Sequence, residues 1–396
     1  MFGVCFGNTS EDYKSVIKSA LPLEQLVVIE IGGSFAAPFA GQILGDLGAE
    51  VIKVERAEGD DARQWGAPFI DGSSGSFHMT NRNKLSVVLD LRNKDDLARL
   101  KALVRDRADV VIQNMRPGLV EQLGIDAASL LAIKPGLIYC NMGAFGGTGP
   151  LADRPGYDPL LQAFTGIMSI VGEEGRPPMR VGASIVDMGT GLWAVIGVLA
   201  ALLRRGGTGG EIGGTVDVSL FETAVVWMTP FVMRYTLTGE IAKSMPSAQV
   251  GYIAPYGAFR TADGYLMIAA GNNNLFGKLA TLLGHGEWVT DERFATNERR
   301  CANRETLNAL IEDALRLEPT EKWYPRVEAA GVPCSPVHNV GQLVEHEQTR
   351  AMGLIQELPG HAPTTQVMLP ISFDGKRPVP HRGVPRVGEH NDQVFP

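Results

Sequence analysis

The sequence predicts an α/β protein whose larger part is built on an open, mostly parallel β-sheet. Short apolar runs rich in β-branched residues alternate with helical segments over residues 26–146, which is the pattern of successive βαβ units. A second region, with hairpin and helix patterns, follows in the later half of the chain. A length of 396 residues is enough for two domains. We therefore expect a large α/β domain and a smaller α+β domain.

The first βαβ unit occupies residues 26–55. LVVIEIGG (26–33) is an apolar run ending in glycines, as buried parallel strands often are. SFAAPFAGQILGDLG reads as a helix closed by Gly48, and AEVIKVE (49–55) as the next strand. The turn IGGSFAAPFAG does not match GxGxxG, so the pattern does not favour a nicotinamide cofactor.

The remaining elements follow the same two patterns. The α/β alternation continues with the strands SVVLDL (86–91), ADVVIQN (108–114) and GLIYCNMGAFG (136–146) and the helix DDLARLKALVRD. AFRTADGYLMIAAG predicts a hairpin with its turn at 262–264. LFGKLATLLG and RETLNALIEDALRL have helical periodicity, so this part of the chain has the character of an α+β domain.

Composition and charge narrow the class of protein. Hydrophobic residues make up 44% and charged residues 20%, which is ordinary for a globular enzyme, and the net charge of -8 argues against nucleic acid as a partner. The four cysteines form no CxxC pair, and the seven histidines show no HExxH spacing, so we expect no metal site. The start lacks a signal-peptide pattern, so we expect a cytoplasmic location. We interpret the long apolar run after Asp187 as a buried helix, with a membrane span as the less favoured alternative.

Basic residues recur just after the predicted strands. Arg56 follows VIKVE, Arg92 follows VVLDL, and Arg116 lies in QNMRPG. The carboxyl ends of parallel strands face the ligand crevice of an open sheet, where arginines can bind a phosphorylated ligand. Each arginine taken alone is more typical of a solvated surface, but their equivalent positions raise the weight of a shared anionic ligand.

Two aspartates stand at predicted helix starts. Asp187 opens an apolar run that carries no further charge until Arg204. Asp is a good N-cap, so Asp187 is interpreted either as a cap or as a nucleophile. Asp158 is followed by Pro159, which suits an N-cap and the first helical position, and we expect Asp158 to cap its own helix.

Several stretches together resemble the family III CoA-transferases, which include formyl-CoA and carnitine CoA-transferases. The resemblance covers nearly the whole chain, and its specificity comes from the joint order and spacing of the stretches. They are FAAPFAGQILGDLGAEVIKVER, NRNKLSVVLDLR, ADVVIQNMRPG, RPGYDPLLQAFTGIMSIVG, SIVDMGTGLWAVIGVLAALL, GVPCSPVHNV and VGEHND.

The resemblance implies a transferase that moves CoA from an acyl-CoA donor, with succinyl-CoA as a candidate, to a carboxylic acid acceptor. It implies an aspartyl-CoA thioester intermediate, and the family's aspartate matches Asp187. CoA and acyl-CoA would be substrates, with no tightly bound cofactor and no metal. The CoA contacts that the resemblance implies are Phe35, Ala36, Arg56, Leu91, Arg92, Asn114, Met115, Arg116, Tyr157 and Asp158.

The resemblance also implies an organisation. It predicts a Rossmann-like, CoA-binding large domain formed by residues 1–205 and 335–396, and a small domain, with the linker back to the large one, formed by 236–334. Residues 206–235, which begin with a glycine-rich run, would be a linker and connecting helix. Two chains would form an interlocked homodimer. The expected partners are acyl-CoA and a small carboxylic acid, without nucleic acid or membrane.

Two other functions stay open at this point: an α-methylacyl-CoA racemase-like activity and a catalytically silent CoA-binding protein. Tyr157 stands where racemases have a histidine, and a tyrosine with a pKa near 10 is a poor base at neutral pH. Phe35 stands where family members often have glutamine, and PSAQVGYIAP (246–255) is the nearest match to a glycine-rich lid. These departures argue against a formyl or oxalyl substrate.

Overall fold

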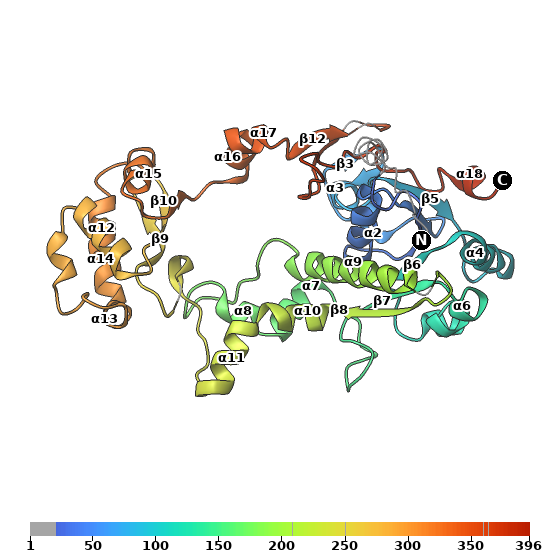
Figure 1. The fold of residues 1–396 in the computed structure, drawn as a ribbon, viewed down its shortest axis with the longest axis horizontal. Helices are drawn as coiled ribbons and strands as arrows, with labels where there is room; N and C mark the ends of the chain where they lie inside the picture. Colours follow the sequence, from blue (N-terminus) through green and yellow to red (C-terminus); the bar gives the residue numbers. More distant parts are fainter. Residues whose placement is uncertain (1–20, 208, 250, 359, 363) are drawn as a thin grey trace, which may run out of the picture. The chain divides into compact units, whose positions relative to one another are not determined.

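The computed structural model describes residues 21–396 except 208, 250, 359 and 363, so predictions that fall on the other residues lie outside it. The described residues form two compact units. The first unit comprises the described residues up to Thr165, together with Val181–Pro230 and Met352–Pro396. The second unit comprises Gly166–Arg180 and Phe231–Ala351. Both ends of the described chain therefore belong to the first unit (Figure 1).

The first unit is built on a six-stranded sheet in the order β5-β2-β1-β6-β7-β8, and every pairing in it is parallel. This confirms the predicted α/β class with a parallel sheet. The strands are β1 Val27–Ile31, β2 Glu50–Glu55, β5 Lys84–Val88, β6 Val110–Gln113, β7 Ile138–Gly143 and β8 Gly214–Ser219.

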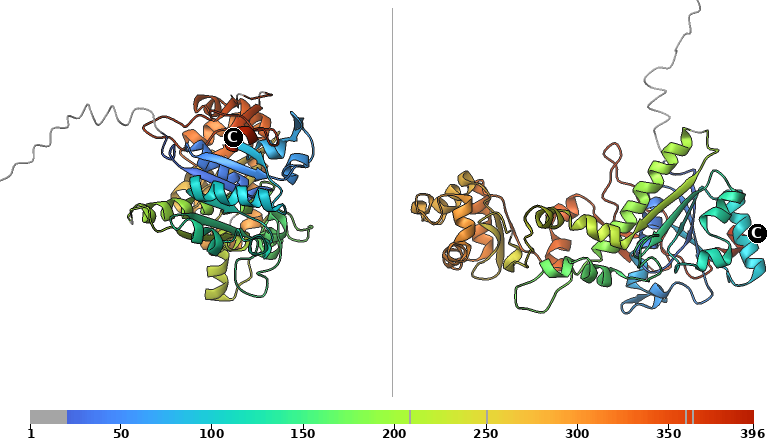
Figure 2. Two further views of the ribbon diagram at one scale, coloured as in Figure 1. Left: turned by 90° about the vertical axis from the view of Figure 1, so that its right-hand side faces the viewer. Right: turned by 90° about the horizontal axis from the view of Figure 1, so that it is seen from below.

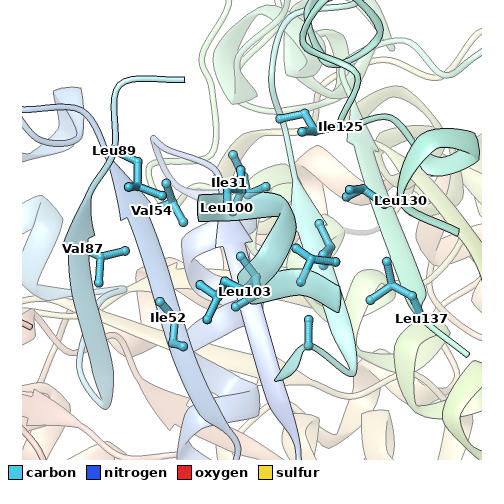
Figure 3. Close-up of a cluster of buried hydrophobic side chains, with 14 of the residues drawn as sticks. Ile31, Ile52, Val54, Val87, Leu89, Leu100, Leu103, Ile125, Leu130 and Leu137 are labelled. Atoms are coloured by element: carbon cyan, nitrogen blue, oxygen red, sulfur yellow. The ribbon is translucent and has the colours of Figure 1, made fainter. Parts of the chain in front are cut away.

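Helices cover both faces of this sheet. One face carries α4 Lys94–Arg107 and α6 Ala127–Ile133, whose leucines pack on alternate strand residues in a dry core (Figure 3). Members of this core include Ile31, Ile52, Val54, Val87, Leu100, Leu103, Leu130 and Leu137. Against the other face lie α2 Ala36–Asp46 and α9 Ile185–Gly206.

Helix α9 crosses α2 at very short range and runs beside β7 and β8 (Figures 1 and 2). At Gly191 a Cβ would lie 3.0 Å from the backbone oxygen of Ala36, so a larger residue would force the two helices apart. Among the described residues, α9 is the one helix whose length and apolar composition would suffice to cross a membrane. One side of α9 is buried inside the unit, through Val186, Ala194, Val195 and Val198. Several apolar side chains on its other side are exposed.

The second unit contains the three-stranded antiparallel sheet β11-β10-β9. Its strands are β9 Tyr256–Arg260, β10 Tyr265–Ala269 and β11 Cys334–Pro336. Arg260 pairs with Tyr265, which confirms the predicted hairpin and its turn. The helices are α12 Asn273–Leu282, α13 Asn297–Ala302, α14 Arg304–Leu315 and α15 Thr320–Ala329. Of these, α12, α14 and α15 share a core with the sheet.

Smaller elements complete the two units. Those of the first are η1 Asp61–Gln64, the hairpin β3 Phe69–Ile70 and β4 Ser73–Ser74, α3 Gly75–His78, α5 Leu119–Leu123, α7 Asp158–Phe164, α10 Leu220–Trp227, the hairpin β12 Ile355–Leu358 and β13 Thr364–Val367, and α18 Asn391–Val394. Those of the second are α8 Ile167–Ile170, η2 Pro246–Ala248, η3 Gly286–Val289, α16 Val340–Glu345 and α17 Glu347–Ala351, and α11 Thr229–Thr238 begins at the boundary.

The structure divides the chain differently from the sequence interpretation at three places. Residues 206–235, predicted as a linker and connecting helix, also contain β8, which completes the main sheet, and their helix α10 packs on α9. Gly166–Arg180 and the stretch 335–351 belong to the second unit. The glycine-rich run begins at the last residue of α9, Gly206, and ends at the first residue of β8, Gly214, so it is too short to separate two domains.

The C-terminal stretch VGEHND covers the edge of the main sheet at β5. The backbone N–H of His390 donates to the Ser86 oxygen at 3.0 Å, and the Val88 N–H donates to the Asn391 side chain at 2.8 Å. These bonds occupy the free edge of β5 and attach the end of the chain to the first unit.

Candidate active site

A cavity of about 1230 Å³ opens in the first unit at the carboxyl ends of the strands. All the residues predicted for the site line this cavity. They are Phe35, Ala36, Arg56, Leu91, Arg92, Asn114, Met115, Arg116, Tyr157, Asp158 and Asp187. The cavity thus brings together residues that are far apart in the sequence, at the carboxyl ends of the strands, as the rule for open parallel sheets predicts.

The three predicted arginines follow β2, β5 and β6, and all are exposed to the cavity. Arg56 pairs with Asp61 and donates to the Gly59 oxygen at 3.1 Å, and Arg92 lies 3.2 Å from Asp90. Arg116 forms no ion pair with the residues that the structure describes. Exposed pairs are weak, so these guanidinium groups are available to an anionic ligand.

Asn114, at the end of β6, fixes the turn between β1 and α2. Its Oδ1 accepts the Gly33 N–H at 3.0 Å and its Nδ2 donates to the Gly33 oxygen at 2.9 Å. The helix α2 that follows has Phe35 at its N-cap and no side-chain cap. The first N–H groups of α2 are therefore left for water or for a ligand in the cavity.

Asp158 does not cap its own helix, contrary to the sequence interpretation. Tyr157 is the N-cap residue of α7, and the buried Asp158 carboxylate is turned toward α9. Its Oδ2 accepts the N–H groups of Val186 at 2.8 Å and Asp187 at 3.2 Å, and Oδ1 accepts from Gln162 at 2.6 Å. Asp158 thus caps a helix that begins far along the chain.

Asp187 is not the cap of α9 either. Ser184 holds the N-cap position, and Asp187 lies in the first turn, half-buried on the cavity wall. Its carboxylate forms no hydrogen bond with any residue of the described chain. Burial, together with the negative charge of Asp158, raises the pKa of Asp187 to about 7. A carboxylate with these properties is a candidate nucleophile or base.

Other residues on the cavity wall were not predicted. Asp60, Arg154, Ser184 and Thr190 line it as well. Thr190 donates to the Val186 oxygen at 2.7 Å and stabilises the first turn of α9. Tyr157 is 57% exposed beside Asp158, so its phenol faces the cavity without a buried environment. Across the described residues, no three His, Cys, Asp or Glu side chains are grouped as metal ligands.

Comparisons with known proteins identify the class. The model of CoA-transferase family III matches residues 23–391. Succinate–glutarate CoA-transferase of Agrobacterium fabrum is 37% identical over 390 residues, covering 94% of this chain and 95% of the relative. Human succinyl-CoA:glutarate CoA-transferase is 32% identical over 386 residues, covering 96% of this chain and 87% of the relative.

A solved structure shows the same fold. The crystal structure of a CAIB/BAIF family protein from Brucella suis is 39% identical, with a TM-score of 0.85 over 95% of this chain and 99% of that structure. The chain therefore belongs to CoA-transferase family III. This confirms the resemblance, and with it the enzyme class: a CoA-transferase, for which CoA thioesters are substrates.

Proposed function

We propose that this chain transfers CoA from succinyl-CoA to a second carboxylic acid, and that Asp187 carries CoA between them as an aspartyl thioester. The observation that carries the proposal is the unpaired, half-buried Asp187 carboxylate on the wall of the cavity. Succinyl-CoA is the donor we infer because relatives named for succinate or succinyl-CoA match nearly the whole chain.

The reaction is a sequence of acyl transfers that needs no net proton. The Asp187 carboxylate attacks the thioester carbonyl and the C–S bond breaks, so that CoA leaves as a thiolate and succinate and Asp187 remain joined in a mixed anhydride. The thiolate then attacks the Asp187 carbonyl, which forms the aspartyl-CoA thioester and releases succinate. An acceptor carboxylate attacks this thioester, and the same steps in reverse release the new acyl-CoA and free Asp187.

The environment of Asp187 suits the first step. Its pKa of about 7 makes the carboxylate more basic than an ordinary aspartate while a large fraction stays ionised at neutral pH. The N–H groups of Val186 and Asp187 are already bound by Asp158, so the start of α9 is not free to hold an oxyanion. The uncapped start of α2, on the same wall, is the better source of N–H donors.

The arginines at the strand ends would bind the phosphates of CoA. Arg56, Arg92 and Arg116 follow β2, β5 and β6 and line the cavity that holds Asp187. Charge-assisted hydrogen bonds from guanidinium groups to phosphate are among the stronger polar contacts in proteins. This arrangement would leave the thioester end of the ligand for the part of the cavity beside Asp158 and Asp187.

We also infer that two chains form a homodimer and that the enzyme works in the cytoplasm. Helices α9 and α10 expose a broad apolar surface, which an isolated soluble protein would not keep in water. Its members are Met188, Leu192, Trp193, Ile196, Leu203, Val225, Val226 and Trp227. A second copy that covers this surface accounts for it without a membrane. Light scattering should give twice the chain mass of 42.6 kDa, and a stable monomer would contradict the homodimer.

An exchange assay tests the function. The protein is incubated with succinyl-CoA and labelled glutarate, and labelled glutaryl-CoA is expected from the wild type and not from Asp187→Asn. Loss of an α-proton from a branched acyl-CoA, without transfer of CoA to the labelled carboxylate, would favour the racemase-like alternative. CoA binding without either reaction, across a panel of donors and acceptors, would favour a silent CoA-binding protein.

A further inference from the structure

Three charged side chains lie inside the apolar strands of the main sheet, on the face that α2 covers. Glu30 of β1, Lys53 of β2 and Lys84 of β5 are all completely buried. Lys53 Nζ lies 2.8 Å from Glu30 Oε1, and Lys84 Nζ lies 2.7 Å from Glu30 Oε2. Burying charges is costly even when they are paired, so this cluster is poorly explained by stability alone.

The cluster reaches the cavity through the turn between β1 and α2. Lys53 Nζ donates to the Gly32 oxygen at 2.8 Å and pairs with Asp60 Oδ2 at 2.9 Å. Asp60 Oδ1 in turn accepts the Ser34 N–H at 3.1 Å. With the two bonds from Asn114 to Gly33, each residue from 32 to 34 is held by a side chain from another strand or loop.

These contacts impose a conformation that the turn would not choose by itself. Ser34 has a φ of 69°, in the left-handed region that a residue with a side chain adopts only at a cost. At Gly33, a Cβ would lie 3.1 Å from Asp60 Oδ1, so the backbone passes the carboxylate in close contact. The turn is therefore packed onto Asp60 and shaped by it.

We infer that Asp60 and Lys53 are positioning residues for CoA, because they hold the turn that presents Phe35 and Ala36 to the cavity. This inference rests on the proposed function, in which the start of α2 contacts the ligand. Asp60 itself is only 8% exposed and carries a negative charge, so it is a poor direct partner for the phosphates of CoA. Although burial opposes it, the charge of Lys53 lowers the pKa of Asp60, which keeps the carboxylate ionised.

The test compares Asp60→Ala with Asp46→Ala as a matched control. Asp46 is 2% exposed and forms a buried ion pair with Arg82, and it does not line the cavity. Both substitutions break a buried ion pair in the same unit, and both should lower the melting temperature. Only Asp60→Ala should weaken CoA binding, by about tenfold or more, which corresponds to losing one hydrogen bond to a charged group.

Binding is measured by isothermal titration with CoA on folded protein, and steady-state kinetics follow. For Asp60→Ala we expect the KM for acyl-CoA to rise and kcat to fall, because the start of α2 is proposed both to contact CoA and to donate N–H groups to the oxyanion. Asp60→Asn keeps an oxygen for the Ser34 N–H but loses the charge that faces Lys53, so its affinity should fall between the wild type and Asp60→Ala, at about threefold below the wild type.

Each result decides the inference. Wild-type affinity in Asp60→Ala would overturn it, and so would an equal loss of affinity in Asp46→Ala, which would show a general effect of destabilisation. If Asp60→Ala does not fold, wild-type affinity in Asp60→Asn overturns it instead. Absence of CoA binding by the wild type is a different outcome, because it rejects the proposed function rather than the role of Asp60.

Discussion

Replacing Asp187 by Asn should abolish CoA transfer and at the same time make the protein more stable at neutral and alkaline pH. Asn has nearly the same shape as Asp but no charge, so the variant removes the nucleophile without leaving a void. The stability gain follows from the position of Asp187, since burial and the Asp158 charge raise its pKa from 3.8 to about 7.

The sign follows from proton linkage. Between pH 3.8 and about 7 the native Asp187 holds a proton that the unfolded chain has lost, so the free energy of unfolding falls as pH rises through this range. Above pH 7 the full cost of the buried charge is present. A change in pKa from 3.8 to about 7, at about 1.36 kcal/mol per pH unit, corresponds to at most about 4 kcal/mol. At pH 5 the same arithmetic leaves about 1.6 kcal/mol.

The assay is denaturant unfolding of the wild type and Asp187→Asn at pH 5 and pH 8.5, alongside the exchange reaction. We expect the stability advantage of the variant to grow with pH while transfer falls by several orders of magnitude. Asp313→Asn is the control, because Asp313 is exposed on α14 and should show no such dependence. If the difference in free energy of unfolding between Asp187→Asn and the wild type is the same at pH 5 and pH 8.5, the desolvated carboxylate is refuted. Full transfer activity in Asp187→Asn would mean that another acid is the nucleophile.

Three further predictions follow from the same site. Arg116→Ala should weaken CoA binding about tenfold and reduce the salt dependence of binding, both measured by titration calorimetry. Unchanged affinity would mean that Arg116 is a surface residue without a role in CoA binding. Asp158→Asn should keep the cap of α9, since Asn caps as well as Asp, but it should lower the pKa of Asp187 because a negative charge is removed. The acid limb of the pH profile of kcat/KM should therefore move to lower pH, and an unmoved limb would contradict the coupling between the two aspartates. Ile196→Glu places a charge on the exposed apolar side of α9 and should give a monomer in light scattering, whereas an unchanged dimer would exclude this surface from the interface.

The sequence predicted most of the main sheet because its strands are short apolar runs bounded by glycine or charge. GTVDVS is strand-like in sequence, but the domain division placed it in the linker, because β8 alternates polar and apolar residues and is only half-buried at the edge of the sheet. The site residues that follow strands could be predicted from topology alone. Asp60 could not, because it stands in the loop stretch EGDDAR, whose composition is typical of a solvated turn. One signal was nevertheless present: charged residues within VVIEI and VIKVE, at positions that a buried strand fills with apolar side chains.

The pair Asp158 and Asp187 shows why rules for local sequence reach a limit at this site. Each aspartate stands at the start of a helix, and each was a reasonable cap for the helix that follows it. In the fold, Asp158 caps α9 from 28 residues away, and this contact depends on how α7 and α9 pack. Because Asp158 binds the backbone N–H groups, the Asp187 carboxylate is spared that role, and the nearby charge raises its pKa. The capping interpretation of Asp187 is therefore wrong, because α9 obtains its cap from a second acid, Asp158, whose charge also raises the pKa of Asp187.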